Sequence, residues 1–134
     1  MRSVESTMMP KFDVTKKQCP SRNVLEGISG KWSILIISLL AKKTYRFGEL
    51  KREIGDISQK VLSQTTQRLE KYGLICRQEF NELPLKVEYS LTPIGKELSD
   101  ILTVLTLWTE DHIPMILQAE QIYTNQLAAK KNIK

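Results

Sequence analysis

The sequence predicts one mainly α-helical domain with a small β-hairpin, and three observations support this fold class. The chain has 134 residues, with 41% hydrophobic and 26% charged residues, which suits a single globular domain. Most apolar residues recur at the helical spacing of three and four positions, whereas one short segment alternates at a period of two. The resulting order is helix, helix, tight turn, helix, hairpin, helix.

Two helices are expected first. Residues 1–18 have no hydrophobic period and are expected to form a flexible arm. Pro20 then opens an apolar pattern that is interrupted at Gly27 and Gly30. This pattern predicts a short helix followed by a longer, largely buried one from about Lys31.

A second pair of helices follows. Phe47–Ile54 has its apolar residues on one face, and after a three-residue turn Ser58 is placed to cap a further helix. This helix is expected to end at Lys71 or Tyr72, where Gly73 can adopt the left-handed conformation that closes many helices.

The hairpin is predicted by a change of period. Leu74–Phe80 is short and compatible with a strand, and Val87, Tyr89 and Leu91 alternate with polar residues. Thr92 and Pro93 then form the typical start of another helix, which Pro114 breaks or kinks before a last helix.

The helices after Thr92 are the candidate dimer interface. Their apolar stripe is wider than packing on one small domain requires, although it could simply close the core of a monomer. We expect the dimer to form through the N- and C-terminal helices, and the interface to include Ile101, Leu105, Trp108, Ile116 and Tyr123.

Charge is distributed unevenly along the chain. The net charge is +5, but it is not uniform. Residues 1–92 contain 16 basic and 10 acidic side chains, whereas residues 93–125 contain one basic and five acidic side chains. A basic body suggests a polyanionic partner, and the alternative is an ordinary solvated surface.

This order of elements is that of a winged helix-turn-helix, in which the second helix of the motif enters the major groove of DNA. The outward face of the predicted helix 58–71 contains no acidic residue. Glutamine, serine and lysine can contact bases or phosphates, although a polar face is also the usual solvent face of a helix. We expect DNA contacts from this helix and from the hairpin, by Ser58, Gln59, Lys60, Ser63, Gln64, Gln67, Lys71 and Lys86.

An ordered set of short segments carries a family resemblance. It runs from Cys19-Pro20 to Gly30-Lys31-Trp32, then Arg46–Leu50, Ile57–Leu62, Leu69-Glu70, Gly73–Ile75, Pro84, Val87–Thr92, Gly95 and Trp108. These segments, within residues 19–112, resemble the HxlR-type transcription regulators, a bacterial winged-helix family related to the MarR group.

The resemblance implies a homodimer that binds inverted-repeat operators in double-stranded DNA and acts as a repressor or an activator. A cysteine at the position of Cys19 is common in the family, and in some members it senses oxidants or electrophiles. Two residues depart from the family pattern: Thr66 replaces an aliphatic residue, which weakens the expected core, and Gln64 stands where a basic residue is common.

The sequence contains few residues that indicate catalysis or metal binding. No catalytic constellation or phosphate-binding loop is visible, His112 is the only histidine, and two cysteines do not make a zinc site or a disulfide framework. We therefore expect no enzyme, cofactor or metal. Cys19 is the one candidate sensor, because it precedes a helix start near Lys16 and Lys17; the alternative is a small buried apolar residue. Cys76 is expected to be structural.

We therefore expect a dimeric DNA-binding regulator, in the bacterial cytoplasm on the nucleoid, without a membrane segment. Its expected parts are the arm 1–18, the winged helix-turn-helix domain 19–112, and a dimerisation helix with a basic tail over 113–134. A small molecule or an oxidant is a possible effector. The rival hypothesis is a winged helix that binds protein through the same surface and does not contact DNA.

Overall fold

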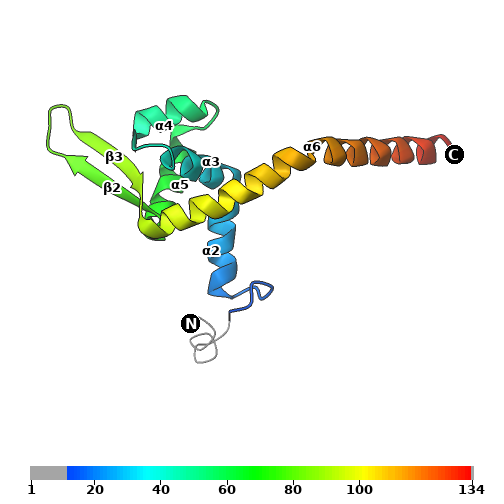
Figure 1. The fold of residues 1–134 in the computed structure, drawn as a ribbon, viewed down its shortest axis with the longest axis horizontal. Coiled ribbons are helices and arrows are strands. Elements are labelled where there is room, and N and C mark those ends of the chain that lie inside the picture. Colours follow the sequence, from blue (N-terminus) through cyan, green and yellow to red (C-terminus); the bar gives the residue numbers. More distant parts are fainter. Residues whose placement is uncertain (1–11, 134) are drawn as a thin grey trace. The chain divides into compact units, whose positions relative to one another are not determined.

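The computed structural model describes residues 12–133. The chain divides into two compact units, Met1–Ser99 and Asp100–Lys134, and one helix continues from the first unit into the second. The fold class is confirmed, since the protein is mostly helical with one small antiparallel sheet (Figure 1).

Four helices of the first unit are α2 (Pro20–Ser29), α3 (Lys31–Leu40), α4 (Phe47–Ile54) and α5 (Gln59–Lys71). All four were predicted, but the expectation that the second is longer than the first is wrong, because α2 and α3 have ten residues each. They are separated by Gly30, whose backbone is extended (φ −68°, ψ 156°).

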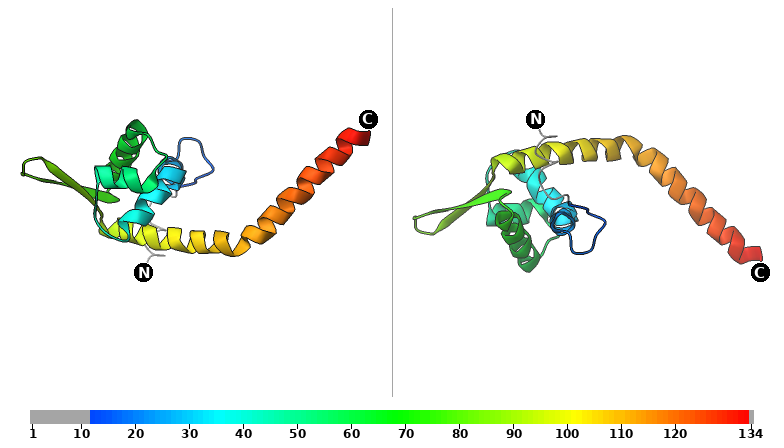
Figure 2. Two further views of the ribbon diagram at one scale, coloured as in Figure 1. Left: turned by 90° about the horizontal axis from the view of Figure 1, so that it is seen from above. Right: turned by 90° about the horizontal axis from the view of Figure 1, so that it is seen from below.

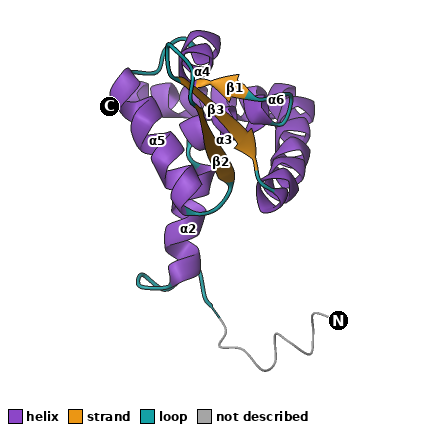
Figure 3. Cartoon of the chain, turned by 90° about the vertical axis from the view of Figure 1, so that its left-hand side faces the viewer, coloured by secondary structure: helices purple, strands orange, loops and turns teal. Residues whose placement is uncertain are grey.

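The sheet has three strands in the order β1-β3-β2 (Figure 3). The predicted hairpin is formed by β2 (Ile75–Phe80) and β3 (Lys86–Leu91), in a register that pairs Ile75 with Leu91. We call residues 75–91 the wing. The third strand, β1 (Tyr45–Arg46), was not predicted, and it pairs with β3 directly before α4 begins.

The core of the first unit lies where α3, α4, α5 and β2 meet. Each of these elements contributes side chains that are no more than 2% exposed, and burial of such aliphatic groups is the main stabilising contribution to a fold. They are Ile36, Ile37, Leu50, Leu62, Leu69 and Ile75.

Helix α2 has no buried residue, and its Val24 and Leu25 are 38% and 48% exposed. It approaches α5 closely at Gly27, where an added Cβ would lie 2.8 Å from Cε2 of Tyr72. The buried Ser33 of α3 donates a hydrogen bond of 2.8 Å from Oγ to the Gly27 carbonyl oxygen. These contacts hold the end of α2 against α3 and α5.

The start of α6 (Pro93–Ile133) is fixed to the end of the helix-turn-helix. Thr92 caps it as predicted, with Oγ1 accepting from the Gly95 backbone N at 3.2 Å and donating to the Gly73 carbonyl oxygen at 2.6 Å. Gly73 has the predicted left-handed conformation, with φ +74°. An added Cβ on Gly95 would lie only 2.0 Å from the carbonyl oxygen of Leu74.

The second unit is the continuation of α6. A break at Pro114 was one of two expected outcomes, but the helix runs through this proline as one element to Ile133. Figure 2 shows a bend in the orange segment of α6. Proline provides the physical reason, because its ring clashes with the preceding turn and it donates no backbone hydrogen bond.

Among the described residues no single helix is long and apolar enough to span a membrane, although α2 and α3, bent by 70°, pass that test as a pair. Of the predicted arm, residues 12–18 form turns, closed by bonds such as Lys16 N to Asp13 O at 3.0 Å. Residues 1–11 of the arm lie outside the described part.

Candidate nucleic-acid interface

Helix α5 is positioned by the turn that precedes it. Gly55 ends α4 with φ +88°, a conformation that favours glycine, and donates its N–H to the Lys51 carbonyl oxygen at 2.9 Å. Ile57 is buried, and Ser58 caps α5 by accepting a hydrogen bond of 3.1 Å from the Val61 N–H. The second helix of the motif therefore starts at a fixed point, as the sequence predicted.

The structure brings most of the predicted DNA-contacting residues together on one face of α5. Ser58 caps this helix. The side chain of Ser63 is half-buried, and its Oγ lies 3.5 Å from Nε2 of Gln67. The expectation that this face contains no acidic residue is wrong: Glu70 is exposed and lines the same cavity as Ser63 and Gln67, because residues 63, 67 and 70 share one side of a helix. The other predicted residues of the helix are all exposed: Gln59, Lys60, Gln64, Gln67 and Lys71.

The inward face of α5 contains two threonines among its leucines. Thr65 donates to the Val61 carbonyl oxygen at 2.7 Å, and Thr66 donates to the Leu62 carbonyl oxygen at 3.0 Å. Both side chains are no more than 3% exposed. Because these hydroxyl groups have partners, Thr66 is accommodated in the core without an unsatisfied polar group.

The wing presents fewer free cations than its sequence suggested. Lys86 pairs with Glu88 at 3.2 Å, and its Nζ lies 4.8 Å from the centre of the Phe80 ring. Arg77 pairs with Glu79. A phosphate would therefore have to compete with Glu88 for Lys86.

Sequence reasoning missed a group of cations around α4. The Glu49 carboxylate accepts a hydrogen bond of 2.8 Å from the Arg46 backbone N, and this bond lowers the pKa of Glu49. The positive charges of Lys43, Arg46 and Arg52 lower it further. The first helix of a helix-turn-helix crosses the DNA backbone, where such cations bind phosphate. The clustering of Lys42, Lys43, Arg46, Lys51 and Arg52 was the available signal.

Cys19 lies directly before α2 and is 8% exposed. Its Sγ is 2.9 Å from Oγ of Ser21. This hydrogen bond is the main reason that the pKa of the Cys19 thiol is lowered; burial opposes it, and the backbone N–H groups of Ser21 and Arg22 lower it further. The shift thus comes from hydrogen bonds rather than from the charges of Lys16 and Lys17 that the sequence suggested.

One further expectation meets a different outcome. Cys76 was expected to be structural, but it is exposed, because alternation along β2 buries Ile75 and turns the next side chain to the other face. His112 lies within α6, stacked on Trp108 with ring centres 4.3 Å apart, and its Nδ1 is 2.7 Å from the Trp108 carbonyl oxygen. Within residues 12–133 no three His, Cys, Asp or Glu side chains are grouped to hold a metal.

The residues predicted for a dimer interface are exposed on α6. Each of the five has between 43% and 65% of its surface accessible: Ile101, Leu105, Trp108, Ile116 and Tyr123. A helix with many such apolar side chains in water is unusual for a monomer and typical of an interaction surface.

Comparisons with known proteins agree with this geometry. The model of the HxlR-like helix-turn-helix family matches residues 27–116. The chain is 38% identical over 112 residues to the HTH-type transcriptional regulator YtfH of Escherichia coli, covering 84% of this chain and 89% of the relative. This relative is named as a transcriptional regulator, as is the solved structure described next, and this is the class of protein that the sequence predicted.

Solved structures give the same result. The structure of ytfH from Salmonella typhimurium has a TM-score of 0.78 and 38% identity, covering 83% of this chain and 99% of that one. The redox regulator HypR in its reduced form has a TM-score of 0.69 and 30% identity, covering 74% and 98%. By the family match over most of its length and by these relatives, the chain belongs to the HxlR-like helix-turn-helix family of transcriptional regulators.

Proposed function

We propose that this regulator is a homodimer that binds inverted-repeat operators in double-stranded DNA, with α5 in the major groove. The observation that supports this most strongly is the exposed polar face of α5, which follows a capped turn and contains two lysines, Lys60 and Lys71, with Glu70 as its single acidic residue. The cations around α4 support the proposal, because the first helix of such a motif crosses the DNA backbone. Such a protein would act in the cytoplasm, on the nucleoid, as a repressor or an activator.

Base preference is expected to depend on the two exposed glutamines in the middle of α5. Replacing Gln64 or Gln67 by alanine should reduce discrimination between operator and mismatched sequences by about 1–3 kcal/mol, if each reads one adenine through two hydrogen bonds. Affinity for selected and scrambled DNA duplexes, measured by fluorescence anisotropy, checks this. Unchanged discrimination in both variants would remove these glutamines from base contact.

Lysine contacts to phosphate are expected to be unequal. Lys60 is exposed, whereas Lys86 is held by Glu88 at 3.2 Å. Lys60→Ala should weaken binding to all sequences and reduce the slope of log affinity against log salt by about one unit. Lys86→Ala should change both the affinity and this slope less. Titrations at several salt concentrations measure both slopes. A larger loss in Lys86→Ala would show that the wing lysine leaves Glu88 when DNA binds.

The dimer is proposed to form through the exposed apolar residues of α6, with a contribution from α2. Since α2 has no buried residue, its Val24 and Leu25 are available to a second copy. Two copies related by a two-fold axis would place two α5 helices toward half-sites about one DNA turn apart, or a multiple of it.

Cys19 is proposed to switch DNA binding in response to oxidants or electrophiles, as a further function of the same dimer. Its thiolate would add to an electrophile such as a quinone, or form a disulfide with a thiol of the second copy while an oxidant such as diamide takes up the two electrons. Support comes from the hydrogen bond to Ser21, the lowered pKa, and the similarity to the redox regulator HypR.

This role predicts an effect of Ser21. In a Cys76→Ser background, Ser21→Ala removes the hydrogen bond that lowers the pKa of Cys19, so less thiolate is present at pH 7. The reaction of Cys19 with a thiol reagent should slow about 3- to 10-fold, and the midpoint of its rate–pH curve should move to higher pH. A stopped-flow pH series measures this. Equal curves would mean that the Ser21 hydroxyl does not control the reactivity of Cys19.

A second experiment tests the switch itself. If wild type and Cys19→Ser bind the operator equally after treatment with diamide or a quinone, Cys19 is not the switch.

The rival function is a winged helix that binds protein and not DNA. An electrophoretic shift distinguishes the two, because binding to DNA must fall steeply as salt rises. Selection of bound duplexes from a random pool would then give the operator and the spacing of its half-sites. Failure to retain any duplex at low salt would favour the protein-binding function.

A further inference from the structure

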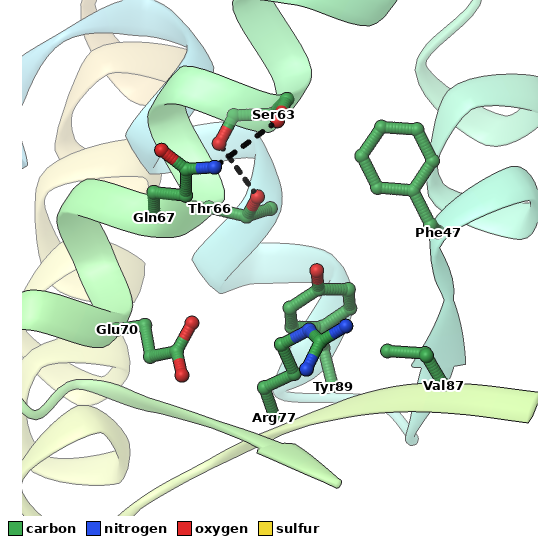
Figure 4. A pocket seen from close by; sticks show the side chains of 8 residues that line it. All are labelled: Phe47, Ser63, Thr66, Gln67, Glu70, Arg77, Val87 and Tyr89. Carbon is green, nitrogen blue, oxygen red and sulfur yellow. Dashed lines mark hydrogen bonds between the residues drawn. The ribbon is translucent and has the colours of Figure 1, made fainter. Parts of the chain in front are cut away.

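A cavity of about 470 Å³ lies between the C-terminal half of α5 and the wing, with Phe47 of α4 at its edge (Figure 4). This volume is within the range of sites that bind small molecules. Ser63, Gln67 and Glu70 reach it from α5, and Arg77 and Tyr89 reach it from the two strands of the wing. It shares Ser63, Gln67 and Glu70 with the polar face of α5 proposed for DNA, but its other lining residues belong neither to that face nor to the apolar surface of α6.

The two charged groups of the cavity are not equivalent. Arg77 already has a counter-ion, since it pairs with Glu79 of the same strand. Among the described residues, no basic side chain lies within 4.0 Å of the Glu70 carboxylate as an ion-pair partner. Figure 4 shows this carboxylate directed toward the cavity. The uncompensated charge of the cavity is therefore negative.

The remaining walls suit an organic cation. Phe47 and Tyr89 provide aromatic rings, and Val87 provides an aliphatic surface. Aromatic faces attract ammonium and guanidinium groups, and such contacts are stronger where water is excluded. Gln67 and Ser63 add an amide and a hydroxyl that can accept hydrogen bonds from a cationic head group.

We propose that this cavity binds a small organic cation with an aromatic or apolar body, whose ammonium or amidinium group pairs with Glu70. This inference rests on the proposed function in one respect. A ligand there covers Ser63 and Gln67, two residues of the face proposed for DNA, so ligand and operator would exclude each other. The ligand would then release the regulator from DNA.

Three phenols of nearly equal size but different charge test the site. They are tyramine, tyrosol and 4-hydroxyphenylacetate, which carry a positive charge, no charge and a negative charge. Calorimetric titration of the full-length protein should show saturable binding of tyramine only. Glu70→Gln keeps the size of the side chain and should weaken tyramine about tenfold or more. Glu82→Gln, the same change on the exposed tip of the wing, should bind like wild type.

Three results would overturn the site: no saturable binding of tyramine, equal binding by wild type and Glu70→Gln, or preferential binding of 4-hydroxyphenylacetate, which would make Arg77 the partner of an anion.

Operator titrations separate this inference from the proposed function. Tyramine should displace operator DNA from wild type, whereas Glu70→Gln should bind DNA at least as tightly, because it has lost a negative charge, and should not respond. If DNA binds and tyramine does not displace it, the exclusion is wrong and the DNA-binding function stands. If tyramine binds through Glu70 and no DNA binds, the cation site stands and the DNA-binding function is wrong.

Discussion

Replacing Gly95 by alanine is expected to prevent stable folding of the first unit. The new Cβ would lie 2.0 Å from the carbonyl oxygen of Leu74, and that oxygen is held in place by the Thr92 N–H at 3.1 Å. A clash with a backbone atom cannot be relieved by a rotamer change, so α6 would have to move away from Gly73 and lose its hydrogen bonds to that segment. We expect a loss of about 4 kcal/mol or more, a large part of the stability of a small domain.

Urea unfolding followed by circular dichroism measures this loss, with Gly30→Ala as the matched control. Gly30 has φ −68°, which alanine adopts freely, and no heavy atom lies within 4 Å of its added Cβ. This control should change the free energy of unfolding by less than about 1 kcal/mol. If Gly95→Ala unfolds at the wild-type urea concentration, the close approach of α6 to Leu74 is not a constraint on folding.

Replacing Leu105 by aspartate is expected to separate the two copies of the proposed dimer. Leu105 is 51% exposed, so the charged side chain should cost the folded monomer little. In an apolar interface the same carboxylate would be buried without a partner, which strongly opposes association. Operator affinity should fall about 100-fold, because each half-site would then be bound without the benefit of the linked second site.

Analytical ultracentrifugation and operator titration measure the two effects. Gln118→Asp adds the same charge to an exposed polar position of α6 and should remain dimeric. If Leu105→Asp sediments as a dimer, the interface lies elsewhere, and the exposed residues of α2 become the next candidates.

Local signals in the sequence were sufficient for the helix-turn-helix. Ser58 and Gly73 determine both ends of α5 through a side-chain cap and a left-handed backbone, and neither effect depends on distant residues. The alternation of Val87, Tyr89 and Leu91 likewise predicted β3 with its observed end. These features are short-range, so a single sequence contains them.

Features that depend on pairing across the fold could not be predicted. Strand β1 has only two residues, too few to show a period, and it exists because Tyr45 pairs with Tyr89. The exposure of Cys76 follows from which face of β2 is turned to the core. The ion pair between Lys86 and Glu88 depends on the orientation of both side chains, which the sequence does not specify. The sequence therefore predicted a basic residue on the wing but not its acidic partner.

The absence of buried residues in α2 has a consequence for hydrogen exchange. A ten-residue helix is marginal in water by itself, and the contacts of α2 with α5 include the close approach of Gly27 to Tyr72 near its end. Its amides can therefore open at a cost well below that of global unfolding, while those of α3 and α5 exchange only when the core is disrupted. In a protomer without a partner, the segment that follows Cys19 is then the part of the domain that unfolds first and refolds last.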